Sequence, residues 1–119
     1  AFLAFTYWQY RQRNRARHEA LTKLQRFTQP AQFGELNQLL RQMAMTYRPR
    51  QHVAGLAGEK WLAFLDAQLP QKEAGFVALS SDWQQGLFSP MPLSEKQFNA
   101  CLRQVKVWIK KARFVQQEQ

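Results

Sequence analysis

Few residues of this 119-residue chain belong to the types that carry out catalysis or bind metal ions. The histidines, His18 and His52, lie on different segments, and neither has another ligand residue at a spacing typical of a metal site on a helix. Cys101 is the only cysteine and lies in an apolar stripe, where a thiol behaves as a small hydrophobic side chain. Glu59 and Asp66 are expected on one helix face, but an acid–base site needs more converging groups than two surface acids. We therefore predict that the protein is not an enzyme and has no catalytic residue, metal site, cofactor or small-molecule substrate.

Basic residues are the most unusual feature of the composition. The chain has 17 Lys+Arg against 8 Asp+Glu, which gives a formal net charge of +9. An excess of this size favours an anionic partner, such as a lipid surface or a nucleic acid. Hydrophobic residues make up 45% of the chain, enough to form a packed core in a single domain.

The positive charge begins directly after an apolar N-terminal segment. Residues 1–8 carry no charge and end in Tyr7 and Trp8, aromatic residues that favour a membrane–water interface. A full span needs about 20 apolar residues, so we interpret residues 1–9 as the end of a truncated transmembrane helix. The basic residues that follow it at alternate positions are Arg11, Arg13, Arg15 and Arg17.

The order of apolar, aromatic and arginine residues predicts the orientation of the chain. Short basic flanks are retained on the cytoplasmic side of a membrane. We therefore expect a bacterial inner-membrane protein in which residues 10–29 form a basic juxtamembrane helix and residues 30–119 form a cytoplasmic helical domain. Anionic inner-membrane lipid is the expected partner of the arginines. A basic helical nucleic-acid-binding domain is the second hypothesis, because basic helices with interleaved aromatic residues also bind nucleic acids.

Apolar residues recur at steps of three and four residues, which predicts helices and no strands. Pro30, Pro49, Gly58 and Pro70 separate these periodic segments. The expected fold is all-α, a compact bundle of about four main helices, the first continuing from a transmembrane segment. The residues expected together in one core are Trp61, Leu65, Leu102, Val105 and Ile109.

Two capping patterns refine this expectation. Ser94 and Gln97 have the spacing of a capping box at the start of the last helix. Residues 70–92 form the least regular segment, in which Ser81 to Gln84 also has capping-box spacing. We expect one or two turns of helix there, ending before Gly86.

Two motifs in the middle of the chain resemble those of a known bacterial family. The motifs are Tyr47-Arg48-Pro49-Arg50 and Trp61-Leu62-Ala63-Phe64-Leu65-Asp66. Further similarity at Leu87-Phe88-Ser89-Pro90 and Trp108-Ile109 extends it over nearly the whole chain. The family consists of small single-pass membrane proteins of unknown function. Their genes lie beside those of MoxR-type AAA+ ATPases and von Willebrand factor A proteins, in operons of the Bat (aerotolerance) type.

The resemblance implies a membrane-anchored accessory or scaffold protein for a MoxR-type ATPase and von Willebrand factor A system. The resemblance suggests that this system assembles or matures envelope or metal-containing complexes. Within the motifs, the apolar residues are expected in the core. The candidate partner-binding residues are the remaining Tyr47, Arg48, Arg50 and Asp66. An ion pair between Arg50 and Asp66 is the structural alternative to a docking surface.

Overall fold

Helices form the fold, as the spacing of the apolar residues predicts. The computed structural model describes residues 2–112, except for the side chains of residues 2, 5, 9, 10, 12 and 13, and contains no strand in that range. The side chain of Arg13 and residue Arg113 therefore lie outside the described residues. In chain order the elements are α1 (Phe2–Leu24), η1 (Pro30–Gln32), α2 (Phe33–Tyr47), α3 (Arg50–Ala54), α4 (Gly58–Ala67), η2 (Gln71–Glu73), η3 (Val77–Leu79), α5 (Ser80–Phe88) and α6 (Glu95–Lys111), where η denotes a short 3-10 helix.

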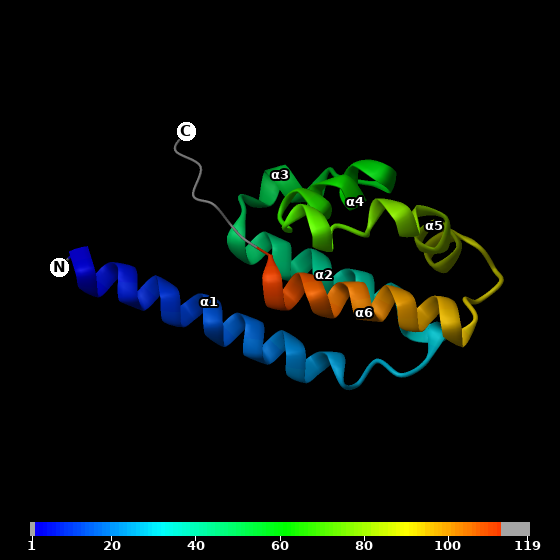
Figure 1. The fold of residues 1–119 in the computed structure, drawn as a ribbon, viewed down its shortest axis with the longest axis horizontal. Coiled ribbons are helices and arrows are strands. Elements are labelled where there is room, and N and C mark those ends of the chain that lie inside the picture. The colour runs from blue at the N-terminus through cyan, green and yellow to red at the C-terminus, as the bar shows by residue number, and fades with distance from the viewer. Residues whose placement is uncertain (1, 113–119) are drawn as a thin grey trace.

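The longest helix, α1, continues without a break from the apolar segment into the basic one. It ends at Leu24, earlier than the boundary expected at residue 29, and Pro30 then starts η1. The second half of α1 lies along α2 and α6, whereas its first half extends beyond the rest of the molecule (Figure 1). Residues 2–112 contain six α-helices, of which α1, α2, α4 and α6 lie where the main helices were expected and α3 and α5 are additional.

Proline and glycine set the breaks between α2 and α4. Arg48, directly before Pro49, has extended backbone angles (φ −128°, ψ 154°), which end α2 as expected for a residue preceding proline. Gly58 has a φ of +58° at the start of α4, a conformation that costs glycine little and other residues considerably more. These breaks fold α3 and α4 back over α2.

The structure corrects the expectation for the segment before α6. Helix α5 runs from Ser80 to Phe88, so Gly86 lies inside the helix and does not end it. A Cβ atom at Gly86 would lie 2.6 Å from the Phe33 ring. The glycine therefore permits α5 to pack closely on the start of α2, and this packing outweighs its low helix propensity. The capping box of Ser94 and Gln97 at the start of α6 is confirmed.

The core lies between α2, α4, α5 and α6. Of the expected members, Trp61, Leu65, Val105 and Ile109 are buried. Leu102 is only partly buried at the edge of the core, because its neighbour α1 covers that face of α6 incompletely. The other large, fully buried side chains include Trp83, Trp108, Phe33, Phe76 and Phe98.

A buried asparagine organises the polar atoms of this core. The Asn37 Oδ1 atom accepts hydrogen bonds from the indole nitrogens of Trp61 and Trp83, both at 3.0 Å. The third buried tryptophan, Trp108, donates to the carbonyl of Leu65 at 3.1 Å. All three buried indole N–H groups thus have acceptors, which removes the penalty for burying them.

Candidate functional site

The first half of α1 exposes its apolar and aromatic side chains. The exposed fractions are 82% for Leu3, 61% for Tyr7 and 56% for Trp8. One turn later, the Arg11 guanidinium lies 5.9 Å from the centre of the Tyr7 ring, within reach of a cation–π interaction. Arg15 is exposed further along the helix. Large apolar side chains and arginines therefore follow one another along a helix segment that the core does not cover.

Arg17 differs from the arginines that precede it. Its guanidinium Nη2 atom donates a hydrogen bond to the backbone oxygen of Ala112, 2.6 Å away, and the side chain is partly buried. A cation at this position also offsets the partial negative charge at the C-terminal end of α6. Arg17 therefore joins α1 to the end of α6, whereas Arg11 and Arg15 remain available to an external partner.

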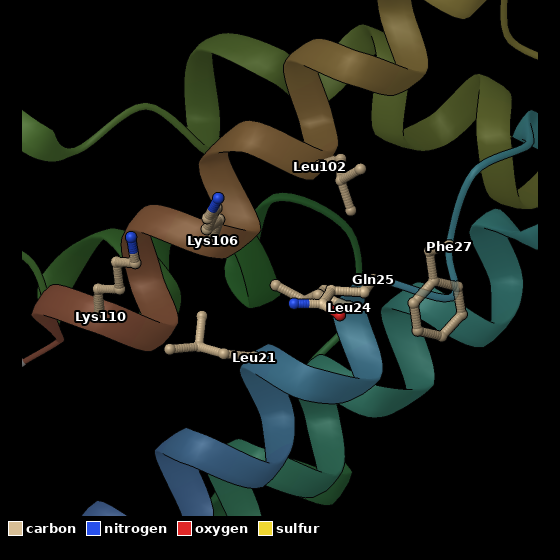
Figure 2. Close-up of a pocket in the computed structure, with 7 residues that line it drawn as sticks. All are labelled: Leu21, Leu24, Gln25, Phe27, Leu102, Lys106 and Lys110. Carbon is tan, nitrogen blue, oxygen red and sulfur yellow. The ribbon is translucent and has the colours of Figure 1, made fainter.

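Beyond Arg17, α1 packs on the domain but leaves an open groove along α6. We call it the α1–α6 groove; its volume is about 460 Å³. Its apolar lining comes from Leu21, Leu24, Phe27 and Leu102. Lys106 and Lys110, one turn apart on α6, line the other side (Figure 2).

The four candidate partner-binding residues of the central motifs have different surroundings. Tyr47 is partly buried at the end of α2 and Arg50 is exposed at the start of α3. Arg48 is partly buried, and its Nη2 atom donates a hydrogen bond of 3.1 Å to Oε1 of the buried Gln68. Arg48 thus connects the end of α2 to the end of α4, and Arg50 is the more accessible of the two arginines.

Asp66 holds a turn of the backbone. Its Oδ1 atom accepts hydrogen bonds from the amides of Gly75 (3.0 Å) and Phe76 (2.9 Å), and Oδ2 accepts one from the amide of Val77 (3.0 Å). Within residues 2–112, no ion pair or hydrogen bond joins Asp66 to Arg50. The carboxylate instead fixes the chain at η3 against α4, a structural role that the motif did not predict.

Three features escaped the sequence analysis. Asn37 lies on the same face of α2 as Leu36 and Leu40, and buried tryptophans need acceptors, which is the signal that points to it. Arg41 lies one turn after it, with its guanidinium 4.3 Å from the centre of the Trp61 ring and Nη1 2.9 Å from the oxygen of Val53. Partial burial lowers the pKa of Arg41. The third feature is the α1–α6 groove, which depends on how two helices far apart in the sequence meet.

The potentially reactive side chains are not arranged around a common site. Burial raises the pKa of the Cys101 thiol to about 12, and the negative charge of Asp82 contributes to the increase. His18 and His52 are exposed on α1 and α3. The described part of the chain holds no group of three or more His, Cys, Asp or Glu side chains that could bind a metal ion. No helix within residues 2–112 combines the length and apolar character needed to cross a membrane.

The fold and these surfaces define a small helical domain with an extended, partly uncovered N-terminal helix. Residues 1–111 match the family described as Domain of unknown function (DUF4381), and the chain belongs to this family. No curated protein and no solved structure matches the chain.

Proposed function

We propose that the protein is a membrane-anchored accessory or scaffold protein that presents its helical domain to a MoxR-type ATPase and von Willebrand factor A system. The observation that carries the proposal is the continuity of α1. One continuous helix contains an exposed apolar and aromatic half and a half that packs on α2 and α6. A helix built in this way transmits the position of an anchor directly to the domain.

The membrane part of the proposal rests on the side chains of the first half of α1. Tyrosine and tryptophan, here Tyr7 and Trp8, favour the headgroup region of a membrane. The exposed Leu3 precedes them in α1, toward the N-terminal end of the helix. The exposed Arg11 and Arg15 follow on the side predicted to be cytoplasmic. Each such base contributes on the order of 1 kcal/mol near an anionic lipid surface. The N-terminal half of α1 is thus suited to the inner membrane and its basic flank to the cytoplasmic leaflet.

The partner part of the proposal rests on the family resemblance and on the surfaces of the domain. The resemblance links the protein to ATPases and von Willebrand factor A proteins. In the proposed system, these partners assemble or mature envelope or metal-containing complexes. The role proposed here is to hold partners at the membrane without catalysing a reaction. The deeply buried thiol of Cys101 and the separate, exposed histidines agree with binding better than with covalent chemistry.

The anchor is tested by topology in cells. A reporter fused after Gln119 is expected to be active in the cytoplasm. Replacing Arg11, Arg13 and Arg15 by Gln is expected to weaken this preference. Arg17 is left unchanged, because its contact with Ala112 supports the fold. A periplasmic reporter in the unmutated protein would contradict the anchor, and salt-sensitive retention on duplex DNA without membrane fractionation would favour the nucleic-acid hypothesis.

The partner is tested by co-purification with the MoxR-type ATPase. Arg50→Glu reverses an exposed charge beside the rigid Pro49 and is expected to reduce co-purification. Lys60→Glu is the matched control, because it reverses an exposed charge on the neighbouring α4. Arg48→Glu also removes the hydrogen bond to Gln68, so this variant requires a parallel melting curve. Unchanged co-purification of Arg50→Glu would exclude the helix junction as the docking face and leave the surface of Arg103, Lys106 and Lys110.

A further inference from the structure

We propose that the α1–α6 groove binds an acidic amphipathic helix of a partner protein. The proposal rests on the proposed function in one respect, that the domain holds protein partners. It adds a binding site separate from the helix junction at Arg50, together with the chemistry of the bound segment, and both are open to measurement without the ATPase.

The shape of the groove suits a helix. It lies between two long helices that run in opposite directions, so that a third helix can lie along both (Figure 1). Leu21 and Leu24 line it from α1 and Leu102 from α6, which gives apolar contacts on both sides. Its volume of about 460 Å³ is sufficient for a row of large apolar side chains. Recognition of this kind uses the apolar face of an amphipathic helix as the anchor.

The charges of the groove specify an acidic partner. Lys106 and Lys110 are exposed, lie one turn apart and supply the charges among the lining residues (Figure 2). In the described structure neither lysine forms an ion pair, whereas the adjacent Lys111 binds Glu73 Oε1 at 3.0 Å. Two acidic side chains one turn apart on a partner helix would match this spacing.

A second groove between α1 and α2 provides an internal comparison. Its volume is about 150 Å³, and its lining includes both Glu19 and Lys23. This groove therefore has less room for a bound helix, and its lining carries both a negative and a positive charge. The difference favours the α1–α6 groove as the docking site.

The position of the groove favours a protein over a lipid. The apolar lining begins at Leu21, beyond Arg17 and on the half of α1 that packs on the domain. The exposed apolar half of α1 lies at the opposite end of this helix (Figure 1). An anchor at that end would hold the groove away from the bilayer.

The test uses the 119-residue chain and two synthetic peptides of about 18 residues, or five helical turns. Both peptides carry leucines at helical spacing on one face, and they differ only in having Glu or Lys beside that face. Fluorescence anisotropy is expected to show binding of the Glu peptide and weaker binding of the Lys peptide. The double variant Lys106→Glu/Lys110→Glu is expected to lose affinity for the Glu peptide by on the order of tenfold and to gain affinity for the Lys peptide.

Further variants separate the groove from general charge effects. Leu102→Gln, which places a polar group in the apolar lining, is expected to weaken binding of both peptides. Glu19→Gln/Lys23→Gln in the α1–α2 groove is the control and is expected to leave binding unchanged. Circular dichroism and melting curves check that each variant folds. Lys106→Gln/Lys110→Gln replaces the charge-reversal variant if that variant does not fold.

Several results would overturn the proposal. One is that the Glu peptide does not bind, and another is that the wild type and the Lys106/Lys110 variants bind it equally well. A third is that the chain self-associates through the groove, shown by self-association that Leu102→Gln removes. Lysine-dependent binding to phosphatidylglycerol vesicles in place of the peptide would show a lipid site instead. If the peptide fails to bind while the ATPase still co-purifies, the groove assignment is wrong and the proposed function stands. If the peptide binds but no ATPase co-purifies and no membrane fractionation occurs, the proposed function is wrong and the groove remains a peptide site.

Discussion

The tryptophans divide the molecule into two regions with different physical roles. Trp61, Trp83 and Trp108 are at most 2% exposed, and each donates its indole N–H to an acceptor inside the domain. Trp8, on the first half of α1, is 56% exposed. The same residue type thus builds the core in one region and forms surface in the other. The apolar character of the first half of α1 is therefore not explained by packing within the domain.

The largest difference between these regions is expected in stability. Trp61→Ala removes a buried ring and its hydrogen bond, and is expected to lower the free energy of unfolding by about 3 to 5 kcal/mol. Trp8→Ala removes an exposed ring and is expected to change it by less than about 0.5 kcal/mol. Urea unfolding followed by circular dichroism measures both. Equal destabilisation by the two variants would contradict the division.

The polar centre of the core is expected to have the next largest effect. Asn37→Ala leaves two buried indole N–H groups without their acceptor and is expected to cost about 2 to 4 kcal/mol. Asn99→Ala, at an exposed position on α6, is the matched control and is expected to be close to neutral. The same unfolding experiment distinguishes them. A neutral Asn37→Ala would mean that other groups satisfy the tryptophans.

The arginines of α1 provide a smaller contrast at the border between the two regions. Arg17→Gln removes the charge-assisted hydrogen bond to Ala112 and is expected to cost about 1 kcal/mol, given its partial exposure. Arg15→Gln, at an exposed position two residues earlier on α1, is expected to leave the melting temperature unchanged. If both variants melt alike, Arg17 does not support the domain in the way described.

The smallest effect concerns the pH dependence of Cys101. Its raised pKa of about 12 means that the folded state keeps its proton at pH values where the unfolded thiol ionises. The thiol's contribution to stability is therefore complete below the ordinary thiol pKa of about 8.5 and falls as the pH rises above it. By pH 9 the loss is expected to be less than about 1 kcal/mol relative to Cys101→Ala. Slow alkylation of the folded protein by iodoacetamide is the accompanying expectation, and rapid alkylation at pH 8 would contradict the burial.

Sequence reasoning succeeded where the signal was local. The capping box of Ser94 and Gln97 depends on residues three positions apart, and Arg48 became extended because Pro49 follows it. Of the five core residues expected from the apolar spacing, all on α4 and α6, four are buried. These signals are contained within single turns or single helices, so no knowledge of the tertiary arrangement is needed.

The errors arose where tertiary packing decides the outcome. Leu102 lies on an apolar stripe, but its exposure depends on where α1 crosses α6. Gly86 has low helix propensity, yet the close approach of Phe33 favours it inside α5. Asp66 is a surface acid by pattern, and only the folded chain brings the amides of residues 75–77 to its carboxylate. The α1–α6 groove belongs to the same class, because two helices from opposite ends of the chain form it.

The central claim is that the first half of α1 enters the membrane while the helical domain stays outside it. Tryptophan fluorescence of the 119-residue chain in vesicles of brominated phosphatidylglycerol measures this, because bromine quenches only tryptophans that reach the lipid. We predict quenching for the wild-type chain and none for Trp8→Phe, whose remaining tryptophans are all buried in the domain. An absence of quenching in the wild type, or equal quenching in the Trp8→Phe variant, would contradict the account.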